Sequence, residues 1–501
     1  MPFQVPEPVR EAVDLLTRAG FEAYPVGGCV RDMLLSTLPH DWDLCTSAQP
    51  EEMKHVFSMF RTLDTGIRHG TVSVLLQGMQ LEITTFRTDG EYADHRHPES
   101  VSFTRNLRED LSRRDFTVNA MAMDLKNDRV IDLFGGKEDL ENKVIRCVGE
   151  PEKRFEEDAL RILRAMRFSA RLGFTIEHET LLGMRKKITG LSAVSRERIS
   201  QELCGLLLSA DPSPTLFLCR DVLFSVIPEM AGMDTCPQNC IYHDRNVFAH
   251  TLGCVSFSPP LLPVRWAALM HDIAKPLCRV TDGEGIDHFP GHPEKGAEIA
   301  RQILEGLKLP RALTDRVYLL VLTHDELLGV ENVWPLLSRI GPEAFDQLTL
   351  LRRADLLAHA EIIRKKADEI PLLTQEKERL INENACLSVT QLALRGKDLT
   401  NLGMTGPAIG RTLDALLQAV VHKEVENEKE ALLRWLRHNG MEKTEKSSKA
   451  VMSGKKKSGF LSFENRSRRE REEESLSPER EDHPCYRNGS SVNECWNMKN
   501  S

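Results

Sequence analysis

The hydrophobic pattern changes near Glu150, and this change limits the fold more than any other feature of the chain. Before this point, β-rich runs alternate with turns and predict strands over residues 23–26, 71–76, 81–85, 101–103 and 130–132. After it, apolar residues recur at helical spacing, as in Leu160, Leu163 and Met166. The sequence therefore predicts an α+β fold, with a mixed-sheet head followed by a mainly helical neck and body.

Length and composition divide the chain further. Its 501 residues exceed what one core usually fills. Proline clusters at 211–214 and 258–260 interrupt the helical pattern, and after Asn439 the composition shifts to Lys, Arg, Glu and Ser, which is typical of disorder. The predicted segments are a head over 1–148, a helical neck over 149–210, a helical histidine-rich domain over 211–370, a helical C-terminal body over 371–440 and a disordered tail over 441–501.

Several classes of protein are excluded by composition. No apolar run reaches the roughly 20 residues that cross a bilayer, and the N-terminal stretch lacks the apolar core of a secretory signal, so we expect no membrane association. The 12 cysteines form no CxxC pair, which favours reduced thiols and a cytoplasmic location. A net charge of −9 argues against a protein that coats nucleic acid, but it leaves room for a local basic groove.

A glycine pair and two aspartates near the N-terminus predict a site for nucleotide chemistry. Gly27 and Gly28 follow a predicted strand and precede a helical stretch, where the backbone can approach a bound phosphate closely. Asp41 and Asp43 follow, and in a strand two residues that are two apart point to the same face. Their carboxylates can then bind one or two Mg²⁺ ions, which activate a hydroxyl and neutralise a leaving pyrophosphate.

The same residues resemble the opening motif of tRNA nucleotidyltransferases and bacterial poly(A) polymerases, within the polymerase-beta-like nucleotidyltransferase superfamily. The resemblance covers most of residues 20–210 and rests on six segments: Gly27 to Asp32, Asp41 to Asp43, Gly66 to Val72, Glu82 to Arg87, Arg113 to Met121 and Glu157 to Arg164. It implies addition of CMP and AMP, from CTP and ATP, to the 3′ end of tRNA to build or repair the CCA terminus.

The resemblance also implies roles for individual residues. Asp41 and Asp43 would hold Mg²⁺ as catalytic carboxylates, with Glu82 as a candidate third carboxylate. The residues implied in nucleotide binding are Gly27, Gly28 and Arg31, with Arg113 and Arg114 at the triphosphate and ribose.

Base choice without a template is predicted to reside in the segment after Glu150. Asp158 and Arg161 are three residues apart, so on a helix they would share one face. A carboxylate acceptor beside a guanidinium donor complements cytosine and adenine, whereas guanine and uracil would present a carbonyl oxygen to the carboxylate. Arg164 and Arg167 extend this edge toward triphosphate or tRNA backbone.

Two alternatives to CCA addition stay open at this point. Bacterial poly(A) polymerases share the same head, so an A-adding or polyadenylating enzyme is the second interpretation. The segment from Thr88 to Pro98 resembles the loop of enzymes that add A, although it carries Arg96-His97-Pro98 where that family usually has Arg-Arg-Pro. The other alternative is an inactive tRNA-binding scaffold, which two facing carboxylates at Asp41 and Asp43 disfavour.

A second constellation lies between residues 243 and 359. Its sequence around His271 and Asp272 resembles the central motif of HD-type metal-dependent phosphohydrolases. Imidazole and carboxylate ligands suit Mn²⁺, Ni²⁺, Fe or Zn²⁺. The resemblance implies phosphodiester or 2′,3′-cyclic phosphate cleavage at damaged tRNA ends, and the alternatives are a helical packing module or a phosphohydrolase whose main activity lies here. The implied metal ligands are His250, His271, Asp272, His292, His324 and Asp355.

Overall fold

The head is built on a mixed sheet. The computed structural model describes residues 4–89, 101–326 and 329–440, and within them five strands form one sheet in the order β1-β2-β5-β4-β3. β2 and β5 are parallel, whereas the other neighbours in this sheet are antiparallel. The strands are β1 (Ala23–Pro25), β2 (Asp43–Thr46), β3 (Arg61–Gly66), β4 (Thr71–Leu76) and β5 (Met79–Thr85). The predicted strand runs that fall in this sheet are confirmed.

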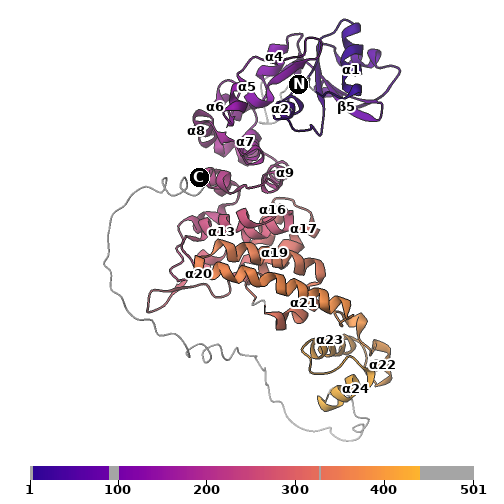
Figure 1. Cartoon of the computed structure of the whole chain (residues 1–501), viewed down its shortest axis with the longest axis vertical. Helices are drawn as coiled ribbons and strands as arrows, with labels where there is room; N and C mark the ends of the chain where they lie inside the picture. Colours follow the sequence, from indigo (N-terminus) through magenta and orange to yellow (C-terminus); the bar gives the residue numbers. More distant parts are fainter. Residues whose placement is uncertain (1–3, 90–100, 327–328, 441–501) are drawn as a thin grey trace, which may run out of the picture. The chain divides into compact units, whose positions relative to one another are not determined.

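Short elements surround this sheet and complete the head (Figure 1). A hairpin of β8 (Met121–Asp124) and β9 (Arg129–Asp132) meets the first strand through a bridge between Val26 and Ala122. The Gly27 amide donates to the Met121 carbonyl, which fixes the turn that follows β1. The other elements are α1 (Glu7–Arg18), α2 (Gly28–Leu34), α3 (Pro50–Val56), β6 (Arg87–Asp89), β7 (Val101–Phe103), α4 (Leu107–Ser112), α5 (Gly136–Glu141) and β10 (Val144–Ile145).

The neck is helical and contains one long amphipathic helix. α7 (Leu160–Leu172) buries Ile162, Leu163 and Met166 and carries arginines along its other face. It ends at Gly173, whose φ of +67° gives a left-handed C-cap. The neighbouring elements are α6 (Pro151–Glu157), β11 (Thr175–Ile176), α8 (His178–Lys187) and α9 (Arg196–Leu207).

The histidine-rich region is a packed set of helices. α13 packs on α19 and α14, and α17 packs on α16 and α14, so that these helices enclose a common interior. Figure 1 shows α13, α16, α17 and α19 gathered together. The main helices are α10 (Ser213–Leu218), α11 (Arg220–Val226), α13 (Val247–Phe257), α14 (Leu262–Met270), α16 (His292–Gly306), α17 (Arg311–Thr323), α18 (Val333–Ile340) and α19 (Pro342–Ala358). Short elements between them are α12 (Ala231–Asp234), α15 (Lys275–Cys278), β12 (Val280–Thr281) and β13 (Asp287–His288).

The C-terminal helices have a small core of their own. Leu416, Leu432 and Leu436 belong to a cluster of buried side chains separate from the main one. This core lies among α22 (Gly396–Asn401), α23 (Pro407–Val421) and α24 (Lys429–His438), whereas the preceding α20 (Glu361–Arg364) and α21 (Ile370–Asn382) pack on the main core. Within the described ranges, every helix is too short or too polar to cross a membrane. The predicted disordered tail over 441–501 lies outside the described residues, as does the loop segment over 90–98.

Candidate active site and histidine cluster

A cavity of about 450 Å³ in the head and neck collects most of the predicted nucleotide-site residues. Its lining also contains residues that the sequence reasoning did not single out. The predicted residues that line it are Gly27, Gly28, Arg31, Asp41, Asp43, Arg114, Arg164 and Arg167. The additional residues are Cys29, Asp32, His40, Asp115, Asn119, Phe168 and Arg171.

Two carboxylates, Asp41 and Asp43, line one side of this cavity, and a third, Glu82, is paired with Asp43 in the sheet. Asp43 is the first residue of β2 and is the parallel register partner of Glu82 on β5. Asp41 lies just before the strand, so the expectation that both aspartates belong to one strand is wrong, although both line the cavity. Burial raises the pKa of Asp43. The neighbouring carboxylates of Glu82 and Asp41 raise this pKa further, whereas the Arg114 guanidinium lowers it. Oxygen donors whose charges repel one another fit a hard divalent cation, which would relieve this repulsion.

Gly27 allows the chain to turn sharply beside these carboxylates. Its φ of +80° and ψ of −128° lie in a region that residues with a Cβ rarely occupy. A Cβ at this position would lie 3.0 Å from Nη1 of Arg114. Helix α2 begins at Gly28, earlier than the helical stretch that the sequence suggested. The turn therefore depends on glycine for two reasons, conformation and space.

Two arginines are held in place by carboxylates and an amide. The Arg31 side chain is buried. Its guanidinium donates one hydrogen bond to Oδ1 of Asn119 at 2.6 Å and another to Oδ1 of Asp32 at 2.6 Å. Arg114 donates to Asp110 at 3.3 Å, and its guanidinium lines the cavity. Burial alone would raise the pKa of Asp110, but Arg114 and Arg113 hold it below its ordinary value. Arg113 donates to Asp110 at 2.8 Å and is not among the residues that line the cavity, so the structure does not bring it to the predicted site.

Helix α7 supplies the cationic wall of the cavity. Arg164 donates to Oδ2 of Asp115 at 2.6 Å, and Arg167 donates to Glu202 at 2.5 Å. The Arg167 guanidinium also lies 4.4 Å from the centroid of the Phe168 ring, within the range of a cation–π contact. Both arginines lie where they were predicted, and Phe168 adds an aromatic face beside them.

The geometry predicted for Asp158 and Arg161 is wrong. Asp158 lies between α6 and α7 with an extended backbone, so the two residues do not share a helix face. The Asp158 carboxylate accepts from the Leu160 amide and from Arg198 at 2.8 Å. Arg161 is buried and donates to Glu157 and to the backbone carbonyls of Arg154 and Arg113. Neither side chain lines the cavity.

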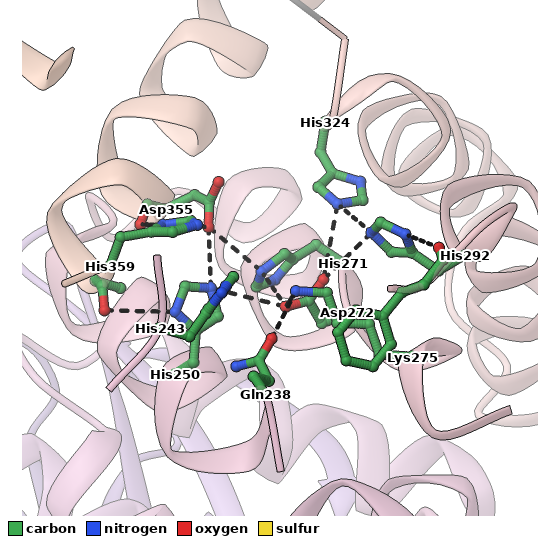
Figure 2. Close-up of polar contacts among 12 residues, drawn as sticks. Gln238, His243, His250, His271, Asp272, Lys275, His292, His324, Asp355 and His359 are labelled. Carbon is green, nitrogen blue, oxygen red and sulfur yellow. Dashed lines mark hydrogen bonds and ion pairs between the residues drawn. The ribbon is translucent and has the colours of Figure 1, made fainter. Parts of the chain in front are cut away.

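The second constellation forms a histidine cluster, defined here as His243, His250, His271, Asp272, His292, His324, Asp355 and His359 (Figure 2). All six residues predicted as ligands lie in this cluster. Five of them line a cavity of about 580 Å³ together with Lys275, and the sixth, His250, lies behind it with Nε2 at 3.0 Å from Oδ1 of Asp355. His243 and His359 were missed, although the spacing of His359 four residues after Asp355 was a usable signal for one helical face.

Asp272 faces imidazoles with both of its oxygens. Its Oδ2 lies 3.2 Å from Nε2 of His271 and 2.9 Å from Nζ of Lys275. Its Oδ1 lies 3.5 Å from Nε2 of His292 and 3.8 Å from Nε2 of His324. Burial alone would raise the pKa of Asp272, but His271 and Lys275 hold it well below its ordinary value. A carboxylate placed in this way can bridge two metal ions.

The imidazoles are oriented by backbone carbonyls. Nδ1 of His271, His292 and His324 lies 2.8, 2.8 and 2.6 Å from the carbonyls of Ala268, Phe289 and Val321. Because a carbonyl only accepts, each Nδ1 carries its proton and leaves the Nε2 lone pair for another partner. Nε2 of His292 and Nε2 of His324 then face each other at 3.3 Å. Burial lowers the pKa of His324 to about 3, so a proton does not fill this position at neutral pH, and a metal ion fits it.

Comparisons with known proteins agree with the geometry of the head. The model described as "Poly A polymerase head domain" matches residues 23–146, the one described as "Probable RNA and SrmB- binding site of polymerase A" matches 173–232, and tRNA nucleotidyltransferase domain 2 matches 295–436. The CCA-adding enzyme of Geobacillus kaustophilus is 36% identical over 433 residues, which cover 84% of this chain and 94% of that protein.

A second relative and a solved structure agree. The CCA-adding enzyme of Limosilactobacillus fermentum is 37% identical over 85% of this chain and 96% of its own length. This chain belongs to the CCA-adding enzyme family. The crystal structure of the Bacillus stearothermophilus CCA-adding enzyme in complex with CTP is 30% identical, with a TM-score of 0.66 over 87% of this chain and 98% of that one. Membership of the CCA-adding family confirms the predicted fold class and nucleotidyltransferase activity.

Substituting Gly27→Ala tests the turn of this CCA-adding enzyme. We expect the KM for CTP and ATP to rise about tenfold, because a strained backbone and a displaced Arg114 cost ~1 to 2 kcal/mol. Gly20→Ala is the matched control, since Gly20 has a φ of +90° but open space around the added Cβ. Steady-state incorporation of labelled nucleotide into tRNA lacking its 3′ end measures both, and equal effects would refute a specific role for the turn.

Proposed function

We propose that the head transfers CMP and AMP to the 3′ end of tRNA, with Asp41 and Asp43 as the catalytic metal-binding carboxylates and Glu82 beside them. The observation that carries this proposal is that Asp41 and Asp43 line one cavity with the Gly27 turn and Arg114, while Glu82 is paired with Asp43 in the sheet. The tRNA 3′-hydroxyl attacks the α-phosphate of CTP or ATP, a new phosphodiester forms and pyrophosphate leaves. Mg²⁺, when bound, supplies charge neutralisation for the attacking and leaving oxygens.

The remaining residues of the cavity hold the substrates in this proposal. Arg31 and Arg114 are preset by Asn119 and Asp110 and offer donors to the triphosphate without further ordering. Arg164 and Arg167 provide positive charge on α7, and their guanidinium groups lie over the buried Phe168 ring, which helps to fix their position.

Two alternatives are less well supported. The carboxylates of Glu82 and Asp41 repel that of Asp43 and so raise its pKa. A scaffold that only binds tRNA would gain nothing from this repulsion, since removing these carboxylates would stabilise the fold. A polyadenylating enzyme shares the head, but the relatives that match most of this chain are named CCA-adding enzymes. We therefore keep tRNA as the macromolecular partner, with CTP and ATP as the nucleotides.

Replacing Asp41 or Asp43 by Asn tests the carboxylates. Either change is expected to lower incorporation of CMP and AMP by ~10³-fold or more, because a metal ligand worth several kcal/mol in the transition state is removed. Binding of tRNA, measured by filter retention, should persist through the arginine contacts. The matched control is Asp14→Asn on the exposed face of α1. Incorporation by Asp41→Asn at the wild-type rate would contradict the assignment.

We keep the prediction that Asp158 and Arg161 select the base. For Asp158, this role requires its carboxylate to exchange one hydrogen-bond partner for another. In the structure Arg198 holds the Asp158 carboxylate, so a cytosine or adenine amine would have to replace that guanidinium. Both side chains of this ion pair are partly exposed, so the free-energy cost of breaking it is small. Arg198 is therefore a positioning residue for the selecting carboxylate.

Substituting Asp158→Ala should let UTP or GTP compete while it slows CTP and ATP. The carboxylate accepts a hydrogen bond from the amine of cytosine or adenine and repels the carbonyl oxygen of uracil or guanine. Sites that hydrogen-bond their ligand can discriminate between such bases by ~10⁴-fold. Competition between labelled nucleotides at matched concentrations measures the change in preference. Arg198→Ala serves as the comparison, because it breaks the same ion pair but keeps the carboxylate. If Asp158→Ala and Arg198→Ala both keep the wild-type preference, base choice resides elsewhere.

We further propose a second activity, hydrolysis of a phosphoester at the histidine cluster. Its support is the pair of ligand sets on the two sides of Asp272, with Lys275 at 2.9 Å as a cation for the phosphate. The ligands are those predicted from sequence, and a divalent transition metal such as Mn²⁺, Ni²⁺, Fe or Zn²⁺ would supply an activated water when bound.

The double substitution His271→Ala and Asp272→Ala should abolish phosphatase activity that Mn²⁺ or Ni²⁺ stimulates and leave CMP and AMP incorporation within about twofold of wild type. The two sites lie in separate cavities with no lining residue in common. Hydrolysis of a 2′,3′-cyclic nucleotide and incorporation into tRNA are measured on the same preparation. A wild-type protein that neither binds nor responds to these metals would make the cluster a packing module.

A further inference from the structure

Three apolar residues in the lining of the cavity at the histidine cluster have no role in the hydrolysis as described so far. Tyr242, Val280 and Ile286 line this cavity, although these residues are 49%, 56% and 37% exposed. Tyr242 lies in the segment before α13, and the other two belong to the hairpin that β12 and β13 form. Exposed apolar side chains that gather at one place mark a binding site, whereas scattered ones do not. We call these three residues the apolar wall.

Backbone hydrogen bonds hold the apolar wall in place. The Asn239 amide donates to Oδ2 of Asp287 at 2.9 Å, and the Asp287 amide donates to the Asn239 carbonyl at 3.0 Å, so the segment before Tyr242 is tied to the hairpin. The Ala360 amide donates to the Tyr242 carbonyl at 3.0 Å, which ties the same segment to the chain after α19. A ligand that binds to the apolar wall therefore does not have to order these segments first.

Two cationic side chains mark the place of a phosphate in the same cavity. Nζ of Lys275 lies 2.9 Å from Asp272 and donates to Gln238 at 2.8 Å, which leaves its third N–H for a phosphate oxygen. Figure 2 shows Lys275 beside these two residues. Arg352 also lines the cavity and donates to Asp355 at 2.8 Å. We therefore expect the phosphate of a substrate beside Asp272, among the predicted metal ligands.

The Phe289 ring connects the place of the phosphate with the apolar wall. Nζ of Lys275 lies 5.2 Å from the centroid of this ring, and Phe289 directly follows β13 and lines the cavity as well. A ligand whose phosphate lies beside Lys275 can thus reach the hairpin inside one cavity. The cavity volume of about 580 Å³ falls within the range of roughly 300 to 1,000 Å³ that is usual for sites that bind a whole small molecule.

We propose that the apolar wall binds the base of a nucleoside phosphate whose phosphate lies beside Lys275, and that the Tyr242 ring stacks on this base. A flat base fits against an aromatic ring and aliphatic side chains. This inference rests on the hydrolysis proposed above and names its substrate class, a nucleotide rather than a simple phosphoester. In the hydrolysis of a 2′,3′-cyclic nucleotide, the oxygen of water bonds to phosphorus, one ribose P–O bond breaks, and the released ribose oxygen takes a proton from that water.

The test compares two substrates that share the reacting group, on full-length protein supplied with Mn²⁺ or Ni²⁺. They are adenosine 2′,3′-cyclic phosphate and methyl ribofuranoside 2′,3′-cyclic phosphate, which lacks the base. For wild type, we expect the KM of the base-free compound to be about tenfold higher and its kcat to agree within about threefold, because stacking of the base acts on binding. Tyr242→Ala should raise the KM of the adenosine compound about tenfold and leave that of the base-free compound within about twofold. Tyr242→Phe should keep the wild-type values, since the ring and not the hydroxyl stacks.

The matched control is Ile241→Ala. Ile241 is the neighbouring apolar residue, is 71% exposed and is not among the described residues that line the cavity. This variant should keep both KM values. Incorporation of CMP into tRNA within about twofold of wild type shows that each variant is folded.

Equal KM values for the two compounds in wild type, or a Tyr242→Ala variant that changes both alike, would overturn the base subsite and leave the hydrolysis standing. Wild-type protein that hydrolyses neither compound with these metals overturns both proposals. An RNA oligonucleotide with a 2′,3′-cyclic end separates two sources of the substrate. A KM below that of the mononucleotide assigns the site to RNA ends, and a KM above it assigns the site to free nucleotides. In either case Tyr242→Ala must raise the KM of the preferred source.

Discussion

The ion pair between the buried Asp115 and the partly exposed Arg164 is the contact on which the geometry of the nucleotide cavity depends. Asp115 belongs to the head, is 8% exposed and accepts both Nε and Nη2 of Arg164 on α7, at 2.8 and 2.6 Å. It also accepts from the Phe116 amide and from Asn119. Burial alone would raise the pKa of Asp115, but Arg164 lowers it, so the carboxylate stays charged. Losing Arg164 would leave the buried Asp115 carboxylate without its main counter-charge, which would destabilise the fold. The pair therefore holds the arginine-bearing helix against the glycine turn.

Three strands of the central sheet, β1, β4 and β5, could be predicted because each carries its own local signal, whereas β2 and β3 are absent from the predicted strand runs. In β5, buried Leu81, Ile83 and Thr85 alternate with less buried neighbours, as a sheet with one covered face requires. The approach of Glu82 to Asp43 could not be predicted in this way, because it depends on the parallel pairing of two strands far apart in the sequence. Motif resemblance named the carboxylates, but only the sheet register explains why Glu82 lies beside Asp43.

Asp158 shows how a local rule can mislead. The spacing of three residues predicts a common face for Asp158 and Arg161 only if one helix covers both. The helix in fact breaks at Asp158, whose carboxylate accepts the Leu160 amide, a capping role that aspartate often fills. Arg198 then neutralises the same carboxylate from α9. The capping preference of Asp was visible in the sequence, whereas its pairing with a residue 40 positions away was not.

Both cavities concentrate groups that destabilise one another when no ligand is bound. In the head, burial and then repulsion by Glu82 and Asp41 raise the pKa of Asp43, and in the cluster the Nε2 atoms of His292 and His324 face each other at 3.3 Å. Packing alone would favour apolar side chains at these positions, since buried polar groups without partners cost free energy. The surrounding helices and sheet offset this cost through their own apolar cores. A bound cation relieves the repulsion in each cavity, so the same arrangement that weakens the free protein strengthens its hold on metal.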